Sequence, residues 1–144
     1  MNYNLLYKEL EQLLEGEEYI ISKMANMSSF IMEVMPNLNW VGFYIIHNDV
    51  LKVGPFQGKP ACSNIPKGKG VCGYTWEKES TTVVPNVHDF PGHIACDAAS
   101  NSEIVIPIFD QNNKMIAELD VDSPVLNRFS EEDREFLEKC AKLI

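Results

Sequence analysis

The sequence predicts an α+β fold in which a mainly antiparallel sheet is flanked by helices at both ends of the chain. The chain has 144 residues, the size of one domain. Apolar residues make up 45% of it, which is typical of a globular protein with one core. Helical periodicity at both ends encloses a middle part in which short β-rich runs alternate with turn signals. We therefore expect residues 1–144 to form a single domain.

Helices are predicted at 2–14, at 17–35 and after Ser130. Gly16 and Pro36 end the first two. The second helix has apolar side chains that recur every three or four positions and so share one face: Ile20, Met24, Met27, Ile31 and Val34. In the last helix, Ser130 to Asp133 resembles a capping box. Its buried stripe is expected to be Phe136, Leu137, Cys140 and Leu143.

Strands are expected at 40–46, 50–53, 61–65, 81–84, 103–109 and 115–122, with a short helix at 71–79. Residues 54–58 are interpreted as irregular, and Asn112 and Asn113 as a two-residue hairpin turn. Residues 85–100 form a long loop with His, Cys and Asp side chains. A long loop inside a compact domain is usually functional or disordered, and the composition of this one disfavours disorder.

The charge of the chain excludes some classes of partner. Twelve basic and 21 acidic side chains give a net charge of −9, which argues against nucleic acid and against an anionic membrane surface. The first residues do not resemble a signal peptide, and no apolar run approaches the about 18 residues that a membrane span needs. We expect a cytoplasmic protein whose cysteines do not form permanent disulfides.

Two ligand sites suggested by spacing are disfavoured. Gly68 to Gly73 matches G-x-G-x-x-G formally, but the surrounding strands look like hairpins and not like a parallel βαβ unit. Cysteine and histidine could form a zinc site, although the ligands are not paired at the usual short spacing: Cys62, Cys72, His93 and Cys96. We therefore expect neither a cofactor nor a metal.

The cysteines differ in their predicted surroundings. Cys140 lies on the apolar face of the last helix and is expected to be a core residue. Cys72 opens a helix whose N-terminus can lower the thiol pKa, and burial is an equal alternative. Cys96 lies among small residues in a polar loop, where His93 could stabilise a thiolate.

Acidic side chains alternate along the last strand and so share one face: Glu118, Asp120 and Asp122. A two-residue hairpin turn would place Glu103 opposite Asp122. The acidic face is then either a solvated surface that protects a sheet edge or a cluster that binds an ammonium group or shares a proton. At this point the residues leave both alternatives open.

Long and unusual strings of residues lie between Asn39 and Phe129, most densely in Phe90-Pro91-Gly92-His93-Ile94-Ala95-Cys96-Asp97. The others are at 39–44, 54–62, 68–73, 85–88, 102–105 and 119–123. These strings resemble the free methionine-R-sulfoxide reductase family, whose members are GAF domains. The resemblance implies a single GAF-type domain that reduces free methionine-R-sulfoxide to methionine.

The resemblance also implies roles for individual residues. Cys96 matches the nucleophile, Cys62 its disulfide partner, and Cys72 a third cysteine that is less essential or can replace the partner. Substrate-pocket residues are matched by Trp40, Glu103, Asp120 and Asp122. The implied reaction passes through a cysteine sulfenic acid and an intramolecular disulfide, which a thioredoxin-like dithiol reduces. It requires no metal, flavin or nucleotide.

Two other functions use the same residues. A non-catalytic GAF module would bind a small ligand in the pocket, and a redox sensor would oxidise the same thiols without turnover. Turnover of free methionine sulfoxide distinguishes the enzyme from both. The sequence leaves open whether the chain forms a homodimer.

Overall fold

The computed structural model of the chain describes residues 1–93 and 98–144. Its centre is a six-stranded sheet of order β3-β2-β1-β6-β5-β4, and each of its pairings is antiparallel. The strands are β1 (Trp40–His47), β2 (Val50–Gln57), β3 (Asn64–Ile65), β4 (Thr82–Val84), β5 (Ser102–Phe109) and β6 (Met115–Ser123). The predicted α+β class is confirmed.

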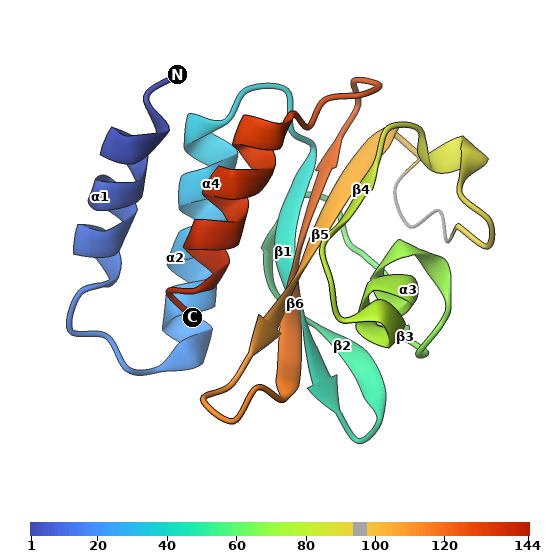
Figure 1. Cartoon of the computed structure of the whole chain (residues 1–144), viewed down its shortest axis with the longest axis horizontal. Helices are drawn as coiled ribbons and strands as arrows, with labels where there is room; N and C mark the ends of the chain where they lie inside the picture. The colour runs from blue at the N-terminus through green and yellow to red at the C-terminus, as the bar shows by residue number, and fades with distance from the viewer. Residues whose placement is uncertain (94–97) are drawn as a thin grey trace.

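Helices cover both faces of this sheet, as Figure 1 shows. They are α1 (Tyr3–Leu14), α2 (Ile20–Val34), α3 (Gly70–Lys78) and α4 (Glu131–Ala141), and a 3₁₀ turn spans Val87–Asp89. The helices α2 and α4 lie against one face, with α1 outside them, whereas α3 covers the other. The site described below lies on the α3 side.

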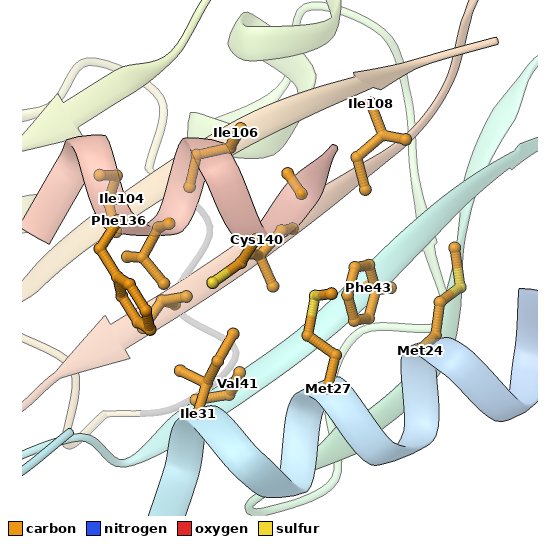
Figure 2. Packing of buried hydrophobic residues seen from close by; sticks show 14 of the residues in the cluster. Met24, Met27, Ile31, Val41, Phe43, Ile104, Ile106, Ile108, Phe136 and Cys140 are labelled. Atoms are coloured by element: carbon orange, nitrogen blue, oxygen red, sulfur yellow. The ribbon is translucent and has the colours of Figure 1, made fainter. Parts of the chain in front are cut away.

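The main core fills the space between the sheet and the pair α2 and α4. Met24, Met27 and Ile31 of α2 are fully buried there, as the helical periodicity predicts. They meet inward-facing side chains of the central strands and of α4, among them Phe43, Ile104 and Cys140 (Figure 2). Cys140 is therefore a small apolar core residue, as expected.

The starts of two elements lie three residues later than predicted. The second helix begins at Ile20 and not at residue 17. The reason is local, because the carboxylate of Glu17 accepts a hydrogen bond from the Tyr19 backbone and holds this segment in a turn. The third strand is shorter than predicted, since only Asn64 and Ile65 pair with β2.

The prediction that residues 54–58 are irregular was wrong. Strand β2 continues to Gln57, because a bulge between Gly42 and Tyr44 absorbs one extra residue in β2. Pro55 lies in this irregular part, where a residue without an N–H does not interrupt the ladder. The extended β2 carries Phe56 to the site.

No helix in residues 1–93 or 98–144 is both long and apolar enough to cross a membrane.

Asp133, near the start of α4, ties the helical layer together. Its carboxylate accepts hydrogen bonds from the Tyr3 hydroxyl, the Ser130 backbone at 2.8 Å and the Arg128 guanidinium at 2.9 Å. Arg128 also donates to the Pro36 carbonyl. Burial alone would raise the pKa of Asp133, but the hydrogen bonds from Tyr3 and Ser130, together with the charge of Arg128, lower it. The predicted capping box is thus confirmed, with Asp133 as its acidic member.

We predict that Asp133→Asn lowers the free energy of unfolding by about 2 kcal/mol at neutral pH, because a charged acceptor of several hydrogen bonds is lost. The folded-state pKa lies below the ordinary value of 3.8, so this contribution is present above that value and is lost as the pH falls through the folded-state pKa. Urea unfolding at several pH values measures it. The exposed Glu132→Gln serves as control, and a difference between wild type and Asp133→Asn that persists in strong acid would contradict the prediction.

Candidate functional site

The β5–β6 hairpin has the predicted register but not the predicted turn. The backbone of Asp110 donates to Lys114 at 2.8 Å, so the loop is one residue longer than expected, with Asn113 at a positive φ of 61°. The Asp110 side chain accepts from the backbones of Asn112 and Lys114 and stabilises this loop. A bulge at Ile116 offsets the longer loop, because the register shifts between Ile108 and Phe109.

Beyond the bulge, Glu103 lies opposite Asp122, as the hairpin interpretation predicts. The side chains of Leu119 and Val121 enter the main core, and the acidic residues that alternate with them along β6 point to the α3 side. Glu103, Glu118 and Asp120 are only 7%, 0% and 5% exposed, so the solvated-surface alternative does not hold. The acidic residues form a buried carboxylate cluster.

Trp40 forms one wall beside these carboxylates. It lies opposite Asp122 on the neighbouring strand, and its indole N–H donates to the Lys59 carbonyl at 3.0 Å. Its ring stacks on Phe56, with centroids 5.1 Å apart, and on Tyr44 at 5.9 Å. The Tyr44 hydroxyl in turn donates to the Cys62 carbonyl. The indole is thus held by two rings and one hydrogen bond.

Gly42 allows this stacking. A Cβ at Gly42 would lie 2.3 Å from the Phe56 Cβ and 2.7 Å from the Trp40 ring. Gly42 also lies opposite Asp120 in the sheet, so the missing side chain leaves room next to the carboxylate.

A pocket opens between the sheet and α3. Its lining comprises Trp40, Tyr44, Pro60, Ala61, Ile65, Lys69, Gly70, Val71, Cys72, His93, Ser100, Glu103, Asp120 and Asp122. Of the predicted site residues, it brings together Trp40, the three pocket carboxylates and Cys72. Tyr44 was missed by the sequence reasoning, although it lies four residues beyond Trp40 and therefore on the same face of β1.

The Cys72 thiol lies next to the carboxylates, with Sγ 3.4 Å from Asp120 and 4.0 Å from Glu103. Burial raises its pKa well above the ordinary value, and the negative potential of Asp120, Glu118 and Glu103 adds to the effect. The alternative in which the helix N-terminus lowers this pKa is wrong, because desolvation and three neighbouring acids outweigh the helix. These surroundings favour the neutral thiol of Cys72 over the thiolate.

The pKa values of the neighbouring carboxyl groups are also raised. Burial raises the pKa of Glu103 and of Asp120 well above their ordinary values, and the potential of a neighbouring carboxylate raises each further. Burial and the nearby Glu103 do the same to Glu118. A group of this kind holds protons near neutral pH and can donate one to a bound molecule.

Glu118 is the most buried of these acids. It was placed on the acidic face by strand alternation but was not singled out as a site residue. Neither of its carboxylate oxygens has a hydrogen-bond partner in the part of the chain that the structure describes. It lies opposite Tyr44 on β1 and interacts with the Cys72 thiol. Glu118 therefore stands behind the pocket and not on its surface.

Of the other predicted residues, His93 and Cys62 lie in the described part of the chain and Cys96 does not. His93 lines the pocket, where burial and the neighbouring His88 lower its pKa, so a neutral ring is favoured. Cys62 is half-buried near Tyr44. Cys96, the predicted nucleophile, lies outside the described residues.

Neither disfavoured ligand motif gains support from the geometry. Gly68 to Gly73 lie in the turn before α3 and in its first residues, and the strands on either side, β3 and β4, both pair antiparallel, so these glycines do not lie in a parallel βαβ unit. Among the described residues, the group of donor atoms close enough to hold a cation is Cys72, Glu103 and Asp120, and not the Cys and His set considered from the spacing.

The fold is an antiparallel sheet with flanking helices, and one face of the sheet carries an acidic pocket that contains a thiol. Comparisons with known proteins identify the family that has this fold. The model of the GAF domain family matches residues 5–144. The chain is 45% identical over 135 residues to a protein of Escherichia coli (strain K12) named free methionine-R-sulfoxide reductase, covering 94% of this chain and 81% of that protein.

Solved structures agree with that match. The reduced form of fRMsr of Staphylococcus aureus has a TM-score of 0.96 and 49% identity, covering 99% of this chain and 92% of that one. Free methionine-R-sulfoxide reductase of Neisseria meningitidis, in complex with its substrate, has a TM-score of 0.93 and 39% identity, covering 98% of this chain and 84% of that one. The chain belongs to the GAF domain family and, within it, to the free methionine-R-sulfoxide reductases.

We predict that Gly42→Ala displaces Trp40 and lowers the free energy of unfolding by about 1–3 kcal/mol, because the new methyl group overlaps Phe56 and the indole ring. Tryptophan emission and urea unfolding measure the two effects. Gly16→Ala is the matched control, since its backbone is strained at φ 80° but its Cβ meets nothing within 4 Å. It should lower stability without changing the emission, and an identical emission change in both variants would refute the explanation.

We predict that Glu118→Met raises the free energy of unfolding by about 1–3 kcal/mol, because an apolar chain of similar length replaces a fully buried carboxyl group whose oxygens have no hydrogen-bond partner in residues 1–93 and 98–144. Glu118→Gln, which keeps a buried polar group, should leave stability nearly unchanged. Urea unfolding of the three proteins provides the comparison. A loss of stability in Glu118→Met would mean that the carboxyl group stabilises the fold.

Proposed function

We propose that this protein is an enzyme that reduces free methionine-R-sulfoxide to methionine. The observation that carries the proposal is the group of Glu103, Asp120 and Asp122, which lines one pocket together with the Trp40 ring. Glu103 and Asp120 are buried there. The identity to reductases of the same family supports it.

Two properties of the pocket suit the free amino acid. Free methionine sulfoxide carries an ammonium group that peptide-bound methionine sulfoxide lacks, and an anionic pocket attracts it. The stacked face of Trp40 offers an apolar wall for the methyl and sulfur end of the substrate. Together they favour the free form over the peptide-bound form.

The first chemical step belongs to Cys96, for which the family resemblance is the support. Its thiolate attacks the electrophilic sulfur of the sulfoxide. A carboxylic acid protonates the sulfoxide oxygen as the S–O bond breaks, and Glu103, Asp120 and Asp122 are the candidates. The protonated oxygen passes to the Cys96 sulfur, methionine leaves, and Cys96 remains as a sulfenic acid.

The remaining steps return the enzyme to its starting state. The Cys62 thiol condenses with the sulfenic acid, which forms a disulfide and releases water. A thioredoxin-like dithiol then reduces this disulfide by exchange and becomes oxidised itself. Cys72, whose raised pKa keeps it protonated, is a poor initial nucleophile and takes the role of a reserve partner for Cys96.

Turnover of free methionine-R-sulfoxide, coupled to NADPH oxidation through thioredoxin, tests this function. We predict activity in the wild type and a loss of more than about a thousandfold in Cys96→Ser, because the nucleophile is removed. Cys140→Ala removes a thiol from the core and should keep the activity, with circular dichroism as the check of folding. No turnover in the wild type, with dithiothreitol also tried, would overturn the proposal and favour a ligand-binding or redox-sensing module.

A further inference from the structure

Three donor atoms in the pocket lie in an arrangement that the reductase reaction does not by itself require. A sulfur of Cys72 and one carboxylate oxygen each from Glu103 and Asp120 lie within 4.8 Å of one another, and all three residues are buried. Two side chains come from neighbouring strands and the third from the start of α3, so the group is held by the packing of the helix on the sheet.

Polar atoms without partners lie in and next to this group. Oδ1 of Asp120 and both carboxylate oxygens of Glu118 are buried, and none of them has a hydrogen-bond partner among residues 1–93 and 98–144. The ion pairs found in those residues, Arg128–Asp133 and Arg134–Glu138, lie on the opposite side of the sheet. Buried acidic oxygens of this kind are stabilised when a cation joins them.

We propose that Cys72, Glu103 and Asp120 bind a divalent cation of intermediate softness, for which Zn²⁺ has the matching ligand preference. Zinc accepts thiolate sulfur at about 2.3 Å and carboxylate oxygen at about 2.0 Å, which in a tetrahedral site puts sulfur and oxygen about 3.5 Å apart. The two sulfur–oxygen distances in the pocket, 3.4 and 4.0 Å, lie on either side of that value.

The pocket also leaves room for an ion to enter and for a water molecule to act as the fourth ligand. Cys72, Glu103 and Asp120 all line it, so a hydrated ion can reach them from solvent and keep one water as the fourth ligand. On binding, the Cys72 thiol and any protonated carboxyl group among the ligands release their protons to solvent, and zinc–sulfur and zinc–oxygen bonds form with no change of oxidation state. The adjacent Glu118 adds negative potential without supplying a ligand.

Binding here would regulate the enzyme, and this part of the inference rests on the proposed function. The ion uses the carboxylates that are proposed to receive the substrate's ammonium group and to protonate the sulfoxide oxygen. Zinc and substrate therefore exclude each other, and zinc acts as a competitive inhibitor that leaves Cys62 and Cys96 reduced.

The test uses Co²⁺, which reports a thiolate ligand by a sulfur-to-cobalt charge-transfer band in the near ultraviolet. The full-length variant Cys62→Ala/Cys96→Ala is the starting protein, because it leaves Cys72 and Cys140 as the remaining thiols. We expect saturable binding of one Co²⁺ with this band, and its displacement by Zn²⁺. Adding Cys72→Ala should abolish the band, and adding Asp120→Asn should weaken binding by about 100-fold or more.

Cys140→Ala in the same background is the matched control and should bind Co²⁺ unchanged. Absence of the charge-transfer band, or equal binding with and without Cys72, would overturn the inference. Circular dichroism of each variant distinguishes a lost ligand from a lost fold.

A second measurement separates this inference from the proposed function. A single turnover of pre-reduced wild-type protein, without any dithiol that would chelate the metal, is run with and without Zn²⁺. Sulfoxide reduction that Zn²⁺ inhibits competitively supports both. Metal binding without reductase activity refutes the proposed function alone, and reductase activity without metal binding refutes this inference alone.

Discussion

The two faces of strand β6 impose the constraint on which the rest of the molecule depends. Leu119 and Val121 are fully buried in the main core, and the acidic residues that alternate with them along the strand face α3. Because successive side chains alternate, a shift of one residue would bring carboxylates into the core and aliphatic side chains into the pocket. The cost of burying carboxylates in the core therefore fixes the register of β6 against both neighbouring strands. The same register fixes the positions of the pocket carboxylates.

The same arrangement carries an energetic cost. A buried carboxyl group without a hydrogen-bond partner destabilises a fold, and Glu118 is fully buried with both oxygens unpaired in the part of the chain that the structure describes. The helical layer on the opposite face offsets this cost with tight apolar packing and with the hydrogen-bonded Asp133. Buried carboxyl groups that destabilise one face of the sheet, together with stabilising packing on the other face, are typical of a functional site.

Sequence periodicity predicted correctly which residues face the pocket. The sequence could not predict properties that depend on burial, such as the pKa of a buried thiol. Strand alternation correctly placed Glu103 opposite Asp122, although two departures from the expected hairpin, a longer loop and the bulge at Ile116, cancel each other. Pattern alone could not predict the bulge that lets β2 continue through Pro55. It also could not decide the pKa of Cys72, because that depends on three acids that are distant in sequence. Spacing along the chain says little about such neighbours.

The surroundings of Cys72 explain why one pocket would need thiols of two kinds. A thiolate is the reactive form of cysteine, and the potential of neighbouring carboxylates opposes its formation. Burial and the neighbouring acids, which are proposed to attract an ammonium group and to donate a proton, together raise the pKa of Cys72 and disfavour its thiolate. A nucleophile that works beside them has to reside on a different element, and in the sequence Cys96 belongs to the loop between β4 and β5. In the proposed reaction, the proton donors are fixed on the rigid sheet and the nucleophile comes from the loop.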